Sequence, residues 1–147
     1  MKNPLFCSET KMRILYSLIA LMFVLYGALV YLFFVPESLF LSLFKIETTY
    51  PLFTIGNENV SILVTSYLAD ILWSVSFVFA VQAVMCLKSQ KVFLLFMCSF
   101  LGCFFELLQM LNVVKGTFDI VDMFVYPLGT AIGILLIELI QKGEKQK

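Results

Sequence analysis

Residues 118–141 read FDIVDMFVYPLGTAIGILLIELIQ, an apolar run that opens with two aspartates and contains a proline. A helix of about 20 mainly apolar residues is long enough to cross the hydrocarbon core of a bilayer. The whole chain has the same character, because 61% of its 147 residues are hydrophobic and only 14% are charged. Its mean hydropathy is +0.99, whereas about a quarter of the residues in a soluble domain are charged. The sequence therefore predicts an integral membrane protein.

Three further apolar runs have the length of a membrane span. They cover residues 14–35, 61–87 and 92–114. We therefore predict an all-α, polytopic membrane protein, with four transmembrane helices in a single domain over residues 1–147. The first run resembles a signal peptide in its order of charged and apolar residues. However, it is too long for one and no small-residue cleavage site closes it, so we interpret it as a retained helix.

Basic residues are unevenly distributed among the segments between these runs. Only Lys45 and Lys115 lie after the first and third runs. The others lie at the termini or between the second and third runs: Lys2, Lys11, Arg13, Lys88, Lys91, Lys142, Lys145 and Lys147. Since cytoplasmic loops carry an excess of lysine and arginine, we expect both termini in the cytoplasm and residues 36–60 outside.

The predicted outer loop begins with an amphipathic segment. Residues 36–44 read PESLFLSLF, in which Pro36 and Glu37 suit the first turn of a helix. The leucines and phenylalanines behind them form an apolar stripe, which predicts a short interfacial helix. The TTYPLF and GNEN segments that follow are typical of turns.

Five polar side chains fall inside or at the ends of the apolar runs: Asp70, Glu106, Gln109, Asp119 and Asp122. Charged groups are costly inside a bilayer, so ionisable residues there indicate a functional site. At 1.5 Å per residue, Asp70 lies roughly 13 Å along its run and Glu106 about 12 Å from the outer end of its own. Asp119 and Asp122 open the fourth run, where the helix dipole favours negative charge. We therefore expect one acidic binding pocket in the outer half of the membrane.

The spacing of these residues also places them on shared helix faces. Residues three or four positions apart lie on the same face of a helix. One such stripe in the fourth run consists of Asp119, Asp122, Tyr126, Gly129 and Gly133. A second stripe, in the third run, consists of Gly102, Glu106 and Gln109. Tyr126 is accordingly predicted to be a binding residue. The three glycines are predicted to be packing residues, because small residues let neighbouring membrane helices approach closely.

Pro127 interrupts the fourth run just beyond Asp122. Proline cannot donate a backbone hydrogen bond, so the Met123 carbonyl loses its usual helical partner. Such a carbonyl is tolerated in a membrane only against protein or water, which favours a kink and a cavity at this place.

Simpler interpretations of the polar residues are open. Asp119 and Asp122 suit helix capping at the water boundary, and the whole set suits a structural hydrogen-bonded network. If the residues instead form a binding pocket, Lys115 alone cannot neutralise its four carboxylates. Either some of the carboxylates are then protonated, or a cation or cationic substrate group is held among them.

Composition argues against several other classes of site. The chain has no histidine, and Cys7, Cys86, Cys98 and Cys103 lack CxxC spacing, so we predict no metal site and interpret the cysteines as small buried apolar residues. A divalent cation at the acidic cluster is an alternative, but no cofactor is predicted. The net charge is zero and no basic, aromatic-studded patch exists, so no nucleic-acid binding is expected.

Two segments of the second half resemble the VanZ-like family of small bacterial membrane proteins. They are ELLQ at residues 106–109 and GTFDIVDMFVYPLGTAIG at residues 116–133. The family pattern of ExxQ, then Asp, then two glycines falls on Glu106, Gln109, Asp122, Gly129 and Gly133, and DILW at residues 70–73 is a weaker echo. The family's turn arginine is replaced by Lys115 and Gly116, and Tyr126 stands at about the place of its asparagine.

The resemblance implies a multi-pass protein of the bacterial cytoplasmic membrane that acts at the cell envelope. The founding member of the family is linked to glycopeptide (teicoplanin) resistance. The implied partners are membrane lipid and a lipid-linked cell-wall precursor or glycopeptide-related ligand. We expect such a group to bind in the outward acidic pocket formed by Asp70, Glu106, Gln109, Asp119, Asp122 and Tyr126.

Three other classes of function are open. A small proton- or cation-coupled transporter would use Glu106 as the group that changes protonation, and four spans would then require a homodimer. An enzyme would need an acid, a base and usually a metal, so the lack of histidine favours no enzymatic activity. Finally, bundles of this size also serve as subunits of larger membrane complexes.

Overall fold

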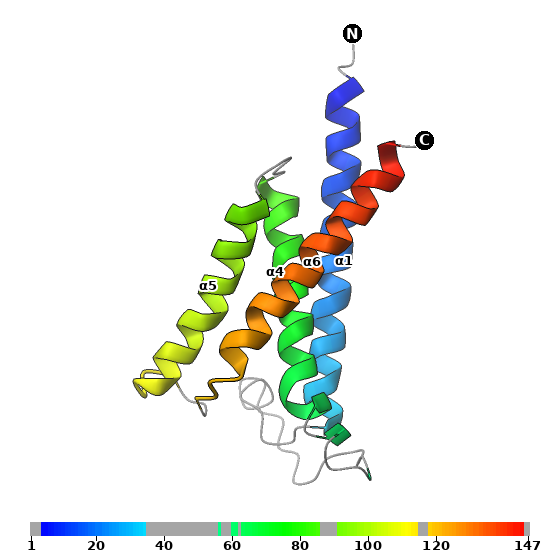
Figure 1. Ribbon diagram of the computed structural model, residues 1–147. Coiled ribbons are helices and arrows are strands. Elements are labelled where there is room, and N and C mark those ends of the chain that lie inside the picture. The colour runs from blue at the N-terminus through cyan, green and yellow to red at the C-terminus, as the bar shows by residue number, and fades with distance from the viewer. Residues whose placement is uncertain are drawn as a thin grey trace.

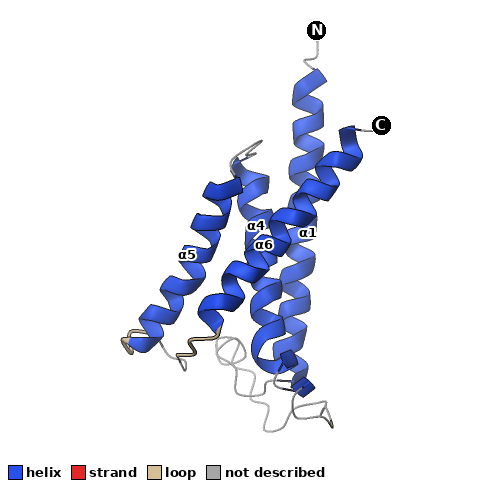
Figure 2. Cartoon of the chain, viewed as in Figure 1, coloured by secondary structure: helices blue, strands red, loops and turns tan. Residues whose placement is uncertain are grey.

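The computed structural model describes residues 4–34, 56, 60–61, 63–85, 91–114 and 118–145. Within these ranges the chain forms helices and a few turn residues, with no strand (Figure 2). The elements are α1 (Pro4–Phe34), the π-helix η1 (Leu63–Leu68), α4 (Ala69–Met85), α5 (Lys91–Met110) and α6 (Asp122–Lys145). The predicted interfacial helix at residues 36–44 lies outside the described residues.

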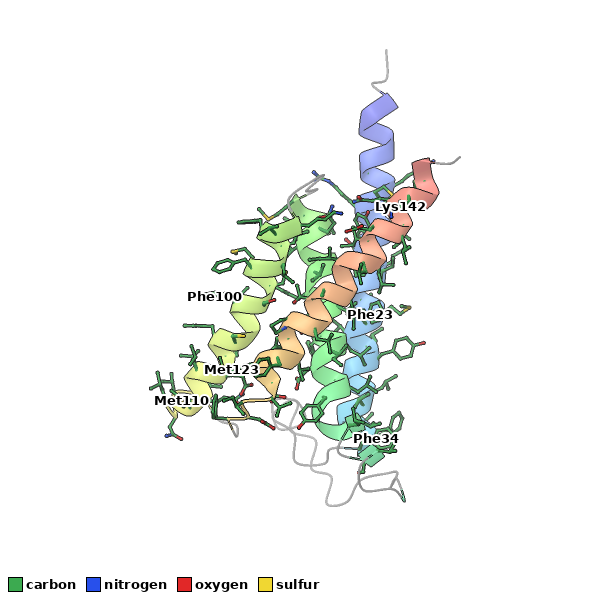
Figure 3. The ribbon with its side chains drawn as sticks, viewed as in Figure 1. Phe23, Phe34, Phe100, Met110, Met123 and Lys142 are labelled. Carbon is green, nitrogen blue, oxygen red and sulfur yellow. The ribbon has the colours of Figure 1, made fainter. Side chains whose placement is uncertain are left out.

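The helices form a bundle in which α4 packs between α1 and α6, and α5 packs against α6 and also contacts α4 (Figure 1). Both termini lie at one end of this bundle, which we call the termini end (Figure 1). The opposite end, where α5 ends and α6 begins, is called the turn end. Figure 3 shows Met110 and Met123 at the turn end and Lys142 at the termini end.

The outer surface of the bundle is apolar. Leu18 on α1, Phe96 on α5 and Phe124 on α6 are 59%, 67% and 73% exposed. Three segments are long and apolar enough to cross a membrane, namely Thr10–Phe34, Lys91–Met110 and Asp122–Glu144. Large exposed apolar surfaces are unfavourable in water and are favourable in lipid. The prediction of helices is therefore confirmed for the described residues, and the length and apolar surface of these helices fit a membrane protein.

The helix boundaries differ from the predicted runs: α1 begins earlier, at Pro4, and α6 extends to Lys145. α4 has 17 residues and is the shorter apolar helix, because the first turns of the predicted second run form the π-helix η1. α5 ends at Met110 and not at residue 114, and α6 begins at Asp122 and not at residue 118. Hydropathy alone misses these ends, since the residues beyond them are as apolar as the helices.

The end of α5 is fixed by Asn112. Its φ of 55° lies in the left-handed region, which asparagine adopts more readily than other non-glycine residues. The Asn112 N–H donates to the Gln109 carbonyl at 2.9 Å and the Val113 N–H donates to the Leu108 carbonyl at 2.9 Å. This pair of bonds is a Schellman motif, which satisfies the last carbonyls of the helix and turns the chain towards α6.

The interface between α1 and α4 contains three aromatic rings. Phe79 lies between Tyr16 and Phe23, with ring centroids 5.8 and 6.2 Å away. A buried hydrogen bond adds to this packing, because the Ser76 hydroxyl donates to the Ala20 carbonyl at 2.9 Å. Small and hydroxylated residues are typical of interfaces between membrane helices.

The interface between α4 and α6 depends on glycine. A Cβ added at Gly129 would lie 2.7 Å from the Ser74 Cβ and 3.1 Å from the Ile71 backbone, and one added at Gly133 would lie 3.0 Å from the Val78 Cβ. These two contacts follow the same order along both helices, so α4 and α6 run in the same direction. They also fix the level of α6, and hence of Asp122, relative to α4.

An ion pair joins α5 and α6 at the termini end. The Lys91 ammonium lies 2.5 Å from the Glu138 carboxylate, and the lysine side chain is 59% exposed. Because this pair is close to solvent, it contributes little to stability. The ion pair lies one helix length away from the turn end. Glu138 is therefore far from the acidic residues of the turn end.

Candidate functional site

Glu106 is the most deeply buried carboxylate of the described residues, with 2% of its surface exposed. It lies on the last turns of α5 and faces the segment that leads into α6. Its Oε2 accepts a hydrogen bond from the Asp119 backbone N–H at 3.2 Å, and its Oε1 accepts a longer one from the Tyr126 hydroxyl at 3.5 Å. Glu106 therefore ties the end of α5 to both sides of the α6 start.

Asp119 forms the turn before α6. Its Oδ1 accepts a hydrogen bond from the Val121 N–H at 2.8 Å, and its carbonyl accepts one from the Asp122 N–H at 3.2 Å. A side-chain bond to the backbone two residues on is an Asx turn, which substitutes for a backbone turn. Asp119 thus lies before the helix and not in its first turn, and it shapes the segment that Glu106 holds.

Asp122 is the first residue of α6, where the helix dipole favours a carboxylate. Its Oδ1 is buried and forms no hydrogen bond with the described residues. The charges of Glu106 and Asp119 are close enough to interact with it. An unsatisfied carboxylate oxygen among like charges is unfavourable, because it loses its hydration without gaining a partner.

Tyr126 is positioned by a glycine on the facing helix. A Cβ added at Gly102 would lie 2.4 Å from the Tyr126 Cγ, so any larger residue at this position must displace the ring. The same ring carries the hydroxyl that reaches Glu106. Gly102 therefore leaves room for the Tyr126 ring, and Glu106 on the same face of α5 accepts its hydroxyl. The glycine thus positions Tyr126 in the site and also allows close helix packing.

Cys103 was not among the predicted site residues. Its Sγ lies 3.6 Å from the Met123 carbonyl and donates a hydrogen bond to it. This carbonyl is the one that lacks its helical partner because Pro127 has no N–H. Two features of the sequence could have indicated this contact. Pro127 frees a carbonyl of its own helix, and Cys103, a hydrogen-bond donor, lies three residues before Glu106 on nearly the same face of α5.

Asp70 and Gln109, the other two predicted binding residues, lie on α4 and α5. Asp70 is half-buried in the first turn of α4, where its carbonyl accepts the Ser74 hydroxyl at 2.8 Å. Gln109 is near the end of α5, and its carbonyl takes part in the Schellman motif. Glu106 forms no hydrogen bond or ion pair with either residue in the described ranges. Of the predicted binding residues, the structure brings together Glu106, Asp119, Asp122 and Tyr126, which we call the Glu106 cluster.

The Glu106 cluster is acidic in its immediate surroundings. No lysine or arginine of the described ranges forms an ion pair with Glu106 or Asp122, and Lys115 lies outside those ranges. No group of three or more aspartate, glutamate or cysteine side chains among the described residues is arranged to hold a metal ion. The cluster thus consists of two carboxylates in contact with backbone or phenol groups and a third, Asp122, whose buried oxygen forms no hydrogen bond in the same ranges.

The chain was compared with protein-family models, with curated proteins and with solved structures, and none of them matches.

Proposed function

We propose that the chain is a VanZ-like membrane protein of the bacterial cell envelope. In this proposal it binds the cationic part of a lipid-linked or cell-wall-related molecule at the Glu106 cluster, and binding there contributes to resistance to glycopeptides such as teicoplanin. Asp122 provides the carboxylate that meets the ligand, and Glu106 holds the turn that presents it. Asp70 and Gln109 belong to the outer parts of the same region.

One observation carries this proposal, namely the buried Asp122 Oδ1 that forms no hydrogen bond with the described residues. A cationic group bound beside it would satisfy that oxygen and offset the repulsion from Glu106 and Asp119. Ionisable groups within membrane segments are costly and are therefore typically functional. The cluster also falls within the two sequence segments that resemble the VanZ-like family.

The proposed topology has four membrane crossings, the second of them made by η1 and α4 together. A span requires about 17–25 residues, and α4 alone has 17. Both termini are proposed to lie in the cytoplasm, since basic residues gather at that side. The turn end then faces outward, and residues 36–44 form an interfacial helix there. The occurrence of both termini at one end of the bundle is consistent with an even number of crossings (Figure 1).

The functional test compares neutral variants of the two buried carboxylates. Glu106→Gln and Asp122→Asn remove the negative charge with little change in size. Each is expected to lower the minimum inhibitory concentration of teicoplanin to the level of the same strain without the protein. Sensitivity to an antibiotic that acts inside the cell should stay unchanged.

Glu144→Gln is the matched control, because Glu144 is an exposed glutamate at the other end of α6. The amount of each variant in the membrane fraction must equal that of the wild type. Full teicoplanin resistance in both cluster variants, at equal membrane levels, would contradict the proposal.

A coupled transporter is the second candidate. The deep burial of Glu106 favours it, because a buried carboxyl can change its protonation state as access alternates. A proton pathway would also need polar groups towards the termini end, but Glu138 there is paired with Lys91. Cation uptake by proteoliposomes that responds to a pH gradient and is lost in Glu106→Gln would support this candidate. Uptake equal to that of empty liposomes would exclude it.

A further inference from the structure

α6 contains a proline in its apolar part, and this proline leaves one backbone carbonyl oxygen of the helix without its usual hydrogen bond. Pro127 has no N–H, so the Met123 carbonyl receives no bond from the residue four positions on. In a membrane a carbonyl without a donor costs several kcal/mol. The Cys103 thiol of α5 lies 3.6 Å from this carbonyl and donates to it.

From this contact we infer that Cys103 is a positioning residue for Asp122. The thiol takes the place of the missing N–H at Met123, the residue directly after Asp122. One turn further along α5, Glu106 accepts the Asp119 N–H at 3.2 Å. α5 therefore holds the α6 backbone by one bond on each side of Asp122.

The two bonds have complementary directions. Before Asp122, the turn that leads into α6 donates the Asp119 N–H to α5, and after Asp122, the Met123 carbonyl of α6 accepts a thiol proton from α5. A thiol is a weak donor, but in the membrane its alternative is hydrocarbon. The pair restricts both sliding and rotation of the first turn of α6 on α5, and so holds the direction of the Asp122 side chain.

Cys98 provides an internal comparison. It lies one and a half turns earlier on α5, is 5% exposed, and packs in the hydrophobic core with no hydrogen bond through its sulfur among the described residues. Cys98 is the more buried of the two cysteines, and among the described residues only Cys103 donates to a carbonyl of α6. The effect of this carbonyl is expected to disappear when Pro127 is replaced, because an alanine at that position supplies the helical N–H.

The test is a double-mutant cycle between Cys103→Ala and Pro127→Ala in purified full-length protein. Because hydrogen bonds between membrane helices contribute modestly to stability, Cys103→Ala is expected to lower the unfolding temperature by about 2 °C in the wild-type background. In the Pro127→Ala background the loss should be markedly smaller. Cys98→Ala is the control and should cost the same in both backgrounds. Equal costs of Cys103→Ala in the two backgrounds would overturn the inference.

The S–H stretching band gives a second readout that packing alone would not move. Infrared difference spectra between wild type and each cysteine variant assign the bands. The Cys103 band is expected at lower frequency than the Cys98 band and should shift upward in Pro127→Ala. Identical positions of the two bands, or no shift in Pro127→Ala, would also overturn the inference. Cys103→Ser, which keeps a donor, should retain more of the stability than Cys103→Ala.

The hydrogen bond between Cys103 and Met123 does not depend on the proposed function. The functional importance of placing Asp122 does rest on the proposed function. Both measurements above are independent of teicoplanin. If the cycle shows coupling while Asp122→Asn leaves resistance unchanged, the proposed function fails and the bond at Met123 stands. If the cycle shows no coupling while Asp122→Asn abolishes resistance, only the inference about Cys103 fails.

Discussion

Glu106 has two roles at the scale of a single residue. Its Oε2 accepts the Asp119 N–H, and its charge lies near that of Asp122. The first role needs only an acceptor oxygen, which glutamine also has, whereas the second needs the negative charge. The choice of substitution therefore separates the structural contribution of this side chain from its electrostatic one.

Glu106→Ala is expected to be less stable than Glu106→Gln by about 1–3 kcal/mol, because it leaves the Asp119 N–H without its partner and opens a cavity at a site that is 2% exposed. Denaturant titration of the purified variants in detergent measures the difference. Equal unfolding free energies of the alanine and glutamine variants would show that the bond to Asp119 contributes nothing. Wild type and Glu106→Gln are the reference pair.

The sequence identified most of the residues that meet at the turn end, but it did not identify Cys103. Glu106, Asp122 and Tyr126 were predicted to be binding residues because helical spacing puts them on facing stripes at one depth. Asp70 was predicted for the same reason, at a similar depth on α4, but Glu106 forms no hydrogen bond with it among the described residues. The sequence alone predicts a buried apolar role for Cys103, because its hydrogen bond depends on a carbonyl in another helix.

At the scale of elements, the two glycines of α6 that contact α4 differ in how closely they approach it. Gly129 faces the backbone of α4, with its added Cβ 3.1 Å from both the Ile71 Cα and the Ile71 oxygen, whereas Gly133 faces only the side chain of Val78. A side chain can adjust more readily than a backbone can. The two helices therefore meet most rigidly close to the Glu106 cluster.

Gly129→Ala is accordingly expected to destabilise the protein by about 1–3 kcal/mol through overpacking. Gly133→Ala should cost less, because about 1 kcal/mol gained from alanine's helix propensity offsets a milder contact. Gly143→Ala is the control, since a Cβ there meets no atom within 4 Å, and it should be neutral or stabilising. Unfolding in detergent measures all three. A cost for Gly133→Ala equal to or above that of Gly129→Ala would contradict this grading.

The helices themselves were predictable, and their ends were less so. Runs of apolar residues predicted helices at the positions of α1, α4, α5 and α6. Residues 111–114 and 118–121 are apolar enough to continue a helix, yet Asn112 and Asp119 bend the chain by local hydrogen bonds. The π-helix η1 had no signal in the hydropathy pattern at all.

At the scale of the whole molecule, the bundle separates two kinds of polar contact. The termini end contains Lys91 paired with Glu138, and the Gln141 amide, which donates to the Tyr16 hydroxyl at 3.4 Å. The turn end contains the acidic Glu106 cluster. Apolar packing of α1, α4 and α6 separates these two ends (Figure 1). The side of the membrane that the turn end faces therefore decides which molecules can reach Asp122.

The most direct measurement is the labelling of Asp122→Cys in intact bacteria by a membrane-impermeant thiol reagent. The protein used has Cys7, Cys86 and Cys98 replaced by alanine and Cys103 by serine, with Glu144→Cys as the reference for the termini end. The proposed outward-facing acidic site predicts that the Asp122→Cys variant is labelled in intact cells, whereas the Glu144→Cys variant is labelled only after lysis. Labelling of the Glu144→Cys variant alone in intact cells, or protection of the Asp122→Cys variant even after lysis, would contradict it.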